Sequence, residues 1–244
     1  MSAFRRAPPE GTASPGGHPA QQRLVRMAAR ALARAGLVHA YGHCSQRLDE
    51  AHFLVCAPQP MGLIGAGYDG TVVPVQGELP EGVLGEVRIH QEIYRLRPEV
   101  GGVVRSMPRD VMTLSAAGVT PAPRHGMGTY FSPGVPLWND VQLVRSPPQA
   151  LGVAQALGAG SAVVMRGNGA VVAADTLENA VVLTWYLEDA ARIELQLRAA
   201  GLARDEDIIA PRDAGRRAVT AGRIFERMWD YLTAGDAEAA GPSI

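Results

Sequence analysis

The sequence contains no lysine, because all 23 of its lysine-plus-arginine positions are arginine. A Schiff base on an enzyme side chain needs a lysine amine, both in lysine-type aldolases and in pyridoxal phosphate enzymes. A phosphate-binding P-loop also depends on its lysine. The missing amine therefore excludes these three chemistries.

Cysteine, long apolar runs and net charge are also scarce. The two cysteines, Cys44 and Cys56, have neither the spacing of a zinc site nor the number needed for a disulfide framework. Every apolar run falls well short of the roughly 20 residues of a membrane-spanning helix. The net charge of -1 offers no excess of positive charge to nucleic acid or to an anionic membrane. We therefore expect a cytoplasmic protein that acts on neither.

The hydrophobic fraction of 47% is enough for one buried core. We expect a disordered leader over 1–18, a single domain over 19–234 and a flexible tail over 235–244. Hydrophobic periodicity and turn residues predict helices and strands in a mixed order. The predicted helices are 21–35, 84–97, 108–117, 149–157, 175–200 and 213–232, and the predicted strands are 43–48, 52–57, 71–75, 100–106, 162–166 and 170–174. Glu178 is placed for a capping box at the start of the long helix.

Strands and helices alternate without the regular repeat of a parallel sheet. This order predicts an α/β domain with a largely antiparallel central sheet and helices on both faces. The residues Gly167-Asn168-Gly169 between the last two strands are typical of a hairpin.

Four segments occur in an order typical of one family: Gly42-His43-Cys44-Ser45-Gln46-Arg47, Glu86 to His90, Ile93 to Val100, and Met165-Arg166-Gly167-Asn168-Gly169. On these segments the chain resembles the class II aldolase/adducin family from about Gln21 to Gly201. It is most similar to the branch with aromatic-acid decarboxylases. The resemblance implies a single-domain, three-layer fold and a homotetramer with active sites between subunits.

The resemblance also implies a divalent metal held by a His-x-His pair after Pro98 and by a third histidine in the later hairpin. Here the pair reads Arg105-Ser106-Met107, and the hairpin position is Asn168. Guanidinium is a permanent cation without a free lone pair, thioether is a poor ligand for hard ions, and an amide oxygen is weak alone. We therefore expect no metal cofactor in this chain.

Three residues are candidates for catalysis, and each also has a purely structural interpretation. Glu86 matches the family's acid/base, although a glutamate there also suits a solvated helix N-terminus. Arg105 places a fixed cation where the metal would lie and could hold a carboxylate or an enolate, or it could form an ordinary salt bridge. His125 stands in a glycine-flanked loop as a proton donor or as an exposed histidine.

The remaining candidates are predicted to bind substrate. They are Arg47, His43, Ser45, Asn168, Met107 and Tyr130. Structural alternatives remain open: Arg47 as a structural anchor, Asn168 as a hairpin residue and Met107 as pocket wall or core filler. His90 is interpreted as a packed, hydrogen-bonded histidine.

The leading hypothesis is a metal-independent enzyme of specialised metabolism that acts on an anionic small molecule. Its reaction would be carbon-carbon cleavage, as decarboxylation or retro-aldol cleavage, or a proton-transfer rearrangement or cyclisation. The alternative is a non-catalytic, adducin-like scaffold or binding protein. A third possibility is a metal-dependent enzyme whose ligands re-form from His43, Cys44, Glu86, His90 and His125. Convergence of Arg105, Asn168, Glu86 and His125 on one closed pocket would favour catalysis, whereas an Arg105 in a salt bridge with a collapsed pocket would favour a scaffold.

Overall fold

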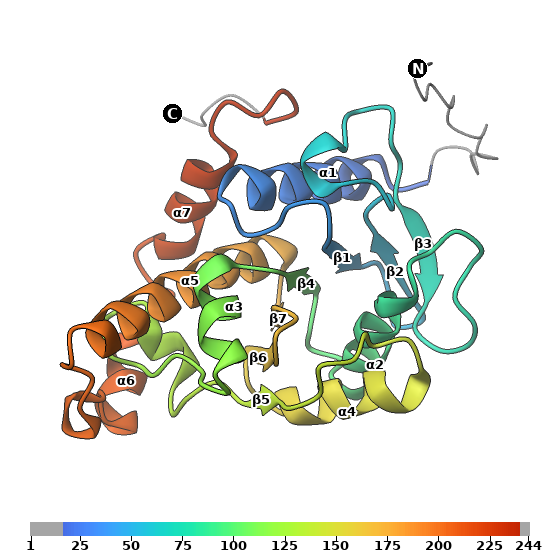
Figure 1. Ribbon diagram of the computed structural model, residues 1–244. Coiled ribbons are helices and arrows are strands. Elements are labelled where there is room, and N and C mark those ends of the chain that lie inside the picture. Colours follow the sequence, from blue (N-terminus) through green and yellow to red (C-terminus); the bar gives the residue numbers. More distant parts are fainter. Residues whose placement is uncertain (1–16, 240–244) are drawn as a thin grey trace, which may run out of the picture.

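The computed structural model describes residues 17–239. A seven-stranded sheet runs through its centre in the order β3-β2-β1-β4-β7-β6-β5 (Figure 1). Neighbouring strands are antiparallel except for the parallel pair of β5 and β6, so the predicted sheet type is confirmed. The strands are β1 (His43–Arg47), β2 (His52–Val55), β3 (Thr71–Pro74), β4 (Gly102–Ser106), β5 (Leu137–Trp138), β6 (Ala162–Met165) and β7 (Ala170–Ala174).

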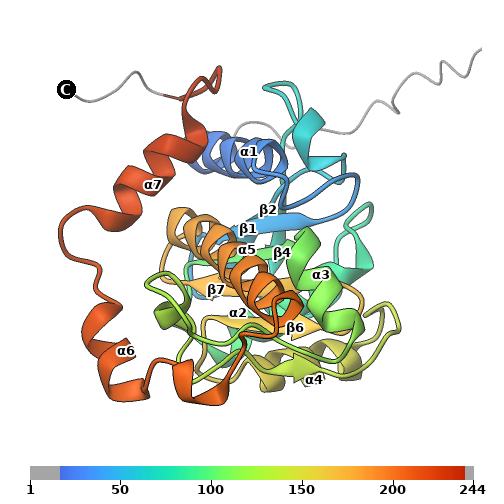
Figure 2. The same ribbon diagram turned by 60° about the vertical axis from the view of Figure 1, so that its left-hand side comes forward.

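Helices cover both faces of the sheet, as predicted (Figures 1 and 2). One face carries α1 (Pro19–Arg34), α3 (Arg109–Ala116) and α5 (Leu177–Ala199), and the other carries α2 (Arg88–Leu96) and α4 (Pro147–Leu157). The helices α6 (Pro211–Arg217) and α7 (Ile224–Thr233) follow at the outside, where α7 packs on α1 and α5. Single 3₁₀ turns span Met61–Leu63, Gly85–Val87, Gly128–Phe131 and Asp205–Asp207. None of the helices in the described part is long and apolar enough to cross a membrane.

The central strand β4 divides its side chains between two apolar cores. Val104 packs with the α1 and α5 layer, whereas Val103 packs with the α2 and α4 layer. Because side chains alternate along a strand, Arg105 lies on the same face as Val103. The sheet therefore delivers the Arg105 guanidinium to the side covered by α2.

Three local predictions were wrong. The helix expected over 213–232 is two helices, because Gly222 and Arg223 adopt positive φ angles of 80° and 59° that a continuous helix does not allow. The helix expected from 84 begins with the 3₁₀ turn and becomes α-helical at Arg88. Thr176, whose side chain accepts from the Asn179 amide, caps α5, so Glu178 does not complete a capping box.

The segment after α7 is fixed to α1, although the sequence predicted a flexible tail from residue 235. Asp236 is buried and accepts hydrogen bonds from Arg30 and Arg34, while Glu238 pairs with Arg26 and Arg30. The expected tail therefore does not begin at 235. Its last residues, 240–244, and residues 1–16 of the predicted leader lie outside the described residues.

The Asp236→Asn variant is expected to lower the free energy of unfolding by about 2 kcal/mol at neutral pH. Removing one charge of a fully buried pair costs roughly 3–5 kcal/mol, and Arg34 here reaches solvent. Burial alone raises the pKa of Asp236, but the hydrogen bonds from Arg30 and Arg34 outweigh it and bring this pKa well below 3.8. The stabilisation is therefore complete above pH 3.8 and is lost as the pH falls toward the folded-state pKa. Urea unfolding at pH 7 and pH 3 checks this, and a gap that widens at pH 3 would contradict it.

Candidate active site

Arg105 lies near the end of β4 with only 2% of its surface exposed. Its Nη2 donates a hydrogen bond of 2.8 Å to Oδ1 of Asn168. Its Nε lies 3.2 Å from Oε2 of Glu86, close enough for an ion pair although the N–H is not aligned as a hydrogen bond. Burial lowers the pKa of Arg105 and the Glu86 carboxylate raises it. Arg105 stays a cation at neutral pH.

Two glycines place Asn168 against the end of β4. Gly167 and Gly169 have φ angles of +63° and +82°, which side-chain-bearing residues rarely adopt. A Cβ at Gly169 would lie 2.0 Å from the Ser106 carbonyl oxygen and 3.0 Å from the Cα of Met107. The turn between β6 and β7 therefore lies directly on the strand that carries Arg105, and Met107 lies beside it.

Glu86 comes to the same place from the 3₁₀ turn that precedes α2. Its side chain is 20% exposed, so it connects the buried guanidinium with the surface. Its Oε2 faces Arg105, while its buried Oε1 has no hydrogen-bond partner among residues 17–239. Of the four residues whose convergence was the test for catalysis, Arg105, Asn168 and Glu86 are thus brought together.

A row of buried polar side chains lies beside this cluster, between β1 and α2. Nδ1 of His43 is 2.8 Å from Nε2 of His90, and Nδ1 of His90 is 2.6 Å from Oγ of Ser45. The Tyr94 hydroxyl is 2.9 Å from the same Oγ and donates to the Ser45 carbonyl oxygen at 3.0 Å. The interpretation of His90 as a packed, hydrogen-bonded histidine is confirmed.

Both histidines are neutral near pH 7. Burial, followed by the nearby Arg105 charge, lowers the pKa of His90 to about 3. Burial, His90 and Arg105 together lower the pKa of His43 well below its usual value. The 4.0 Å separation between His43 Nε2 and Glu86 Oε2 is therefore a contact with a neutral ring rather than an ion pair.

Several buried polar atoms of this region have no hydrogen-bond partner in the described part of the chain. They are His43 Nε2, Glu86 Oε1, Arg105 Nη1, Ser106 Oγ and Asn168 Nδ2. Buried polar atoms without partners cost free energy and are rare, so a cluster of them indicates a place for a ligand or ordered water. A small cavity opens beside His43, between Cys56, Pro58 and Leu84, and His43 is the member of this group that lines it.

Arg47 takes a structural place on the same strand. Its guanidinium donates to the carbonyl oxygens of Val100, Tyr94 and Arg97, and it lies over the Tyr94 ring with 4.7 Å between its Cζ and the ring centroid. These contacts tie β1 to the end of α2. They occupy Nε and Nη2 and leave only Nη1 for the predicted role in substrate binding.

His125 and Tyr130 lie elsewhere in the chain. Nε2 of His125 contacts Oδ2 of Asp189 on α5 at 2.8 Å. The Tyr130 hydroxyl donates to the Val219 carbonyl, and its ring packs against Tyr186 and Phe225. Within the described residues, no hydrogen bond or ion pair joins either residue to Glu86 or Arg105.

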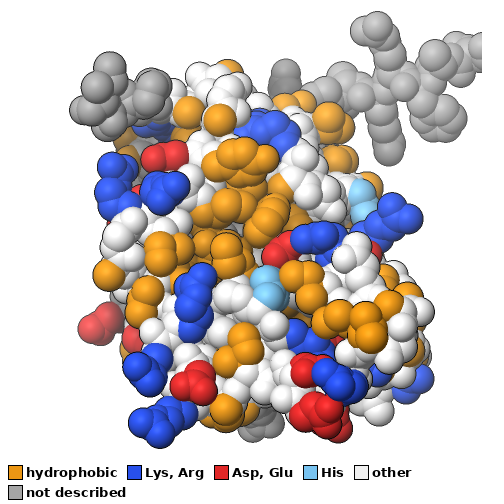
Figure 3. All heavy atoms as spheres, turned by 90° about the vertical axis from the view of Figure 1, so that its left-hand side faces the viewer, with side chains coloured by type: hydrophobic (Ala, Val, Ile, Leu, Met, Phe, Trp, Pro, Cys, Tyr) orange, Lys and Arg blue, Asp and Glu red, His pale blue; other side chains and the backbone are white. Residues whose placement is uncertain are grey.

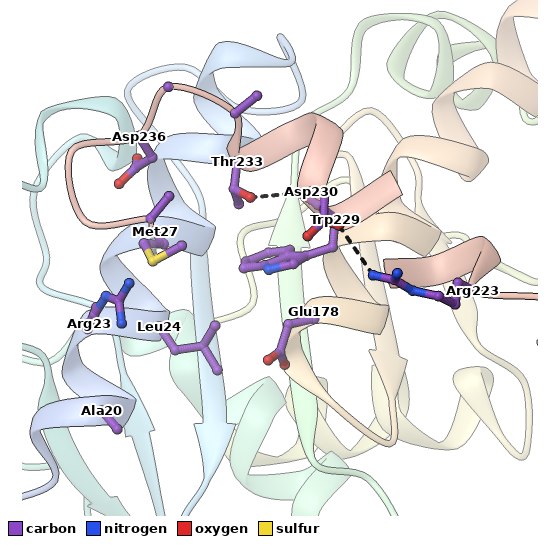
Figure 4. Close-up of a pocket in the computed structure, with 13 residues that line it drawn as sticks. Ala20, Arg23, Leu24, Met27, Glu178, Arg223, Trp229, Asp230, Thr233 and Asp236 are labelled. Atoms are coloured by element: carbon purple, nitrogen blue, oxygen red, sulfur yellow. Dashed lines mark hydrogen bonds and ion pairs between the residues drawn. The ribbon is translucent and has the colours of Figure 1, made fainter. Parts of the chain in front are cut away.

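A wide hollow lies between α1, α7 and the start of α5 (Figure 4). Trp229 and Leu24 give it an apolar wall, and Asp230 at its edge pairs with Arg223 at 3.8 Å. Asp230 and Arg223 are both about two-thirds exposed, so water already solvates them. The hollow contains none of the partnerless buried atoms, and the Arg105 cluster remains the stronger candidate.

Comparison with known proteins now decides the family. The model of the class II aldolase and adducin N-terminal domain matches residues 23–195. The chain belongs to this family. The crystal structure of L-fuculose-1-phosphate aldolase from Thermus thermophilus has 28% sequence identity and a TM-score of 0.67, over 75% of this chain and 97% of that one.

Curated relatives place the chain in the decarboxylase branch of the class II aldolase family. The 3,4-dihydroxyphthalate decarboxylase of Terrabacter sp. (strain DBF63) is 34% identical over 82% of this chain and 92% of its own length. The protein of the same name from Arthrobacter keyseri is 32% identical over 78% of this chain and 84% of its own length. The predicted branch is confirmed, as is the prediction of an enzyme of the carbon-carbon lyase type.

The metal that class II aldolases imply does not fit the residues present here. Arg105 is a buried cation that is already bonded to Asn168, and a second cation beside it would be repelled. Within residues 17–239, no group of three His, Cys, Asp or Glu side chains could hold a metal ion. The alternative ligands are also dispersed, because Cys44 faces the opposite core and His125 binds Asp189.

Proposed function

We propose that this class II aldolase family member is a metal-independent decarboxylase of a hydroxylated aromatic acid. The observation that carries the proposal is the buried Arg105 guanidinium, which contacts Asn168 and Glu86 and whose Nη1 has no partner in the described part of the chain. The names of its relatives support the substrate class, because they act on 3,4-dihydroxyphthalate.

A buried guanidinium is suited to the electrostatic part of this reaction. When a carboxylate leaves as CO₂, the electron pair of the broken bond moves into the ring and onto a conjugated oxygen. Donors fixed around that oxygen stabilise the transition state more than the ground state. Nη1 of Arg105 is such a donor, and the hydrogen bond from Nη2 to Asn168 fixes the plane of the guanidinium.

Glu86 is the group in reach that can move a proton. Decarboxylation breaks one carbon-carbon bond, releases CO₂ and places one proton on the ring carbon. In the proposed step the Glu86 carboxylate takes up a proton from solvent, delivers it to the ring carbon and so returns to the carboxylate that Arg105 holds. The partial exposure of Glu86 supports this exchange.

The Glu86→Gln variant is expected to lose about 10²- to 10⁴-fold in turnover, because it keeps the shape of the side chain and cannot release a proton. Release of CO₂ from 3,4-dihydroxyphthalate by the purified protein is the measurement. Glu92→Gln is the matched control, because Glu92 also lies near Arg105 in sequence but pairs with Arg95 on the surface of α2. Wild-type turnover in Glu86→Gln would contradict the role of Glu86.

Two expectations from the sequence remain proposals for the assembled protein. A homotetramer agrees with the broad apolar band on the face that carries α6 and α7 (Figure 3). His125 does not reach Glu86 or Arg105 within its own chain, so it is proposed as a proton donor only for a site that a neighbouring subunit completes. Asp189 orients its ring, and its buried Nδ1 has no partner among the described residues. A non-catalytic, adducin-like scaffold needs no ligand beside Arg105. The buried polar atoms there that lack a partner among the described residues therefore favour an enzyme.

A further inference from the structure

The hydrogen bonds along the row of polar side chains between β1 and α2 all run in one donor-to-acceptor direction. The Tyr94 end of the row fixes that direction. The Tyr94 hydroxyl lies 3.0 Å from the Ser45 carbonyl oxygen, and a carbonyl only accepts, so Tyr94 donates there. The Tyr94 oxygen then accepts from the Ser45 hydroxyl at 2.9 Å. With its hydrogen committed, Ser45 Oγ accepts from Nδ1–H of His90 at 2.6 Å.

The same argument continues through the two rings. A neutral His90 with its proton on Nδ1 has a bare Nε2, which accepts from Nδ1–H of His43 at 2.8 Å. Neutral His43 is then left with a lone pair on Nε2. The opposite direction would leave the Tyr94 and Ser45 carbonyl oxygens 3.0 Å apart with no hydrogen between them.

The bare Nε2 of His43 lies in a defined place. His43 and Arg105 are cross-strand partners in β1 and β4, so their side chains stand next to each other on one face of the sheet. Both Nε2 of His43 and Nη1 of Arg105 are buried and without a partner among the described residues. The site therefore presents one hydrogen-bond acceptor beside one charged donor.

We propose that His43 Nε2 accepts the hydrogen of a substrate hydroxyl that is adjacent to the oxygen held by Arg105. The site then selects acids with two neighbouring ring oxygens, one a hydroxyl and the other carrying negative charge. His90, Ser45 and Tyr94 are positioning residues that act by fixing the tautomer of His43. This inference rests on the proposed decarboxylation for its substrate, but the tautomer does not depend on any activity.

Nitrogen NMR of the full-length, ¹⁵N-histidine-labelled protein without ligand tests the tautomer. Two histidines that stay neutral from pH 5 to pH 8 should both carry their proton on Nδ1, as the low pKa values of His43 and His90 allow. The two signals need not be assigned to individual histidines, because both rings have the same expected tautomer. Wild-type protein is therefore enough for this measurement. A non-titrating histidine with its proton on Nε2 would overturn the inference. In Ser45→Ala, where His90 loses its acceptor, a mixture of tautomers is expected.

Binding of two isomers tests the recognition itself. By calorimetry, 3,4-dihydroxybenzoate should bind about tenfold more tightly than 3,5-dihydroxybenzoate, since the hydroxyl groups are adjacent only in the first and one hydrogen bond distinguishes them. His43→Phe should remove the preference. Equal binding to wild-type protein, or a preference that persists in His43→Phe, would overturn the proposal. If the tautomer and the binding preference are as expected but no CO₂ is released, only the proposed decarboxylation is refuted.

Discussion

Arg105→Lys is expected to lower decarboxylation turnover by about 10²- to 10³-fold, the usual loss when one preorganised donor to a developing anion is removed. Lysine keeps the positive charge but presents a single ammonium. Arg105 uses separate nitrogens for Asn168 and Glu86 and has Nη1 left for the substrate. One ammonium cannot reach three groups in one plane, so the substitution is not conservative here.

The matched control for this variant is Arg95→Lys. Arg95 also pairs with a glutamate, Glu92, but it does so on the outer face of α2 with its side chain 38% exposed. Its replacement should leave turnover unchanged, because an exposed pair contributes little. Turnover is measured as CO₂ release on variants whose circular dichroism matches the wild type. A fully active Arg105→Lys would show that the guanidinium is only structural.

Gly102→Ala is expected to lower the free energy of unfolding by about 3 kcal/mol or more, at the upper end of overpacking effects. A Cβ on Gly102 would lie 2.3 Å from the Cα of Leu177 and 2.7 Å from the carbonyl carbon of Thr176. These are backbone atoms at the start of α5, and no rotamer change can move them away. The helix must shift from β4, the strand that also carries Arg105.

Gly215→Ala serves as the control, because nothing lies within 4 Å of the added Cβ and the residue lies in α6. Alanine forms helices better than glycine, so a gain of about 0.5 kcal/mol is expected. Both variants are compared by urea unfolding at one protein concentration. If Gly102→Ala is as stable as Gly215→Ala, the close approach of α5 to β4 is not as described.

The layers of the fold follow from local patterns in the sequence. The continuous apolar run in β4 marks a strand that is buried on both faces, and the helical spacing in α2 marks one buried face. Together they require a sheet between two helix layers. The hydrophobic pattern does not indicate the break before α7, because the apolar residues on both sides of Gly222 agree with one helical period. A left-handed residue ends a helix whatever the flanking pattern.

The candidate site was only partly predictable. Glu86, Arg105 and Asn168 could be placed together through the resemblance to a known family. The contact of His125 with Asp189 joins residues 64 positions apart, and no local pattern encodes such a pairing. The carbonyl partners of Arg47 depend on where α2 ends in space.

Tyr94 is not among the site residues that the sequence predicts. Two signals could have found it: Tyr94 is one helical turn after His90, and Ser45 is two residues after His43 on a strand. Both pairs therefore present neighbouring side chains to one another.

The metal content of active enzyme tests the central claim most directly, namely that a guanidinium takes the place of the family's metal. Purified protein is analysed for transition metals and for magnesium, treated with a chelator, and assayed for CO₂ release from 3,4-dihydroxyphthalate. We expect no stoichiometric metal and full turnover after chelation. A metal bound at one ion per subunit, whose removal abolishes turnover and whose return restores it, would contradict it.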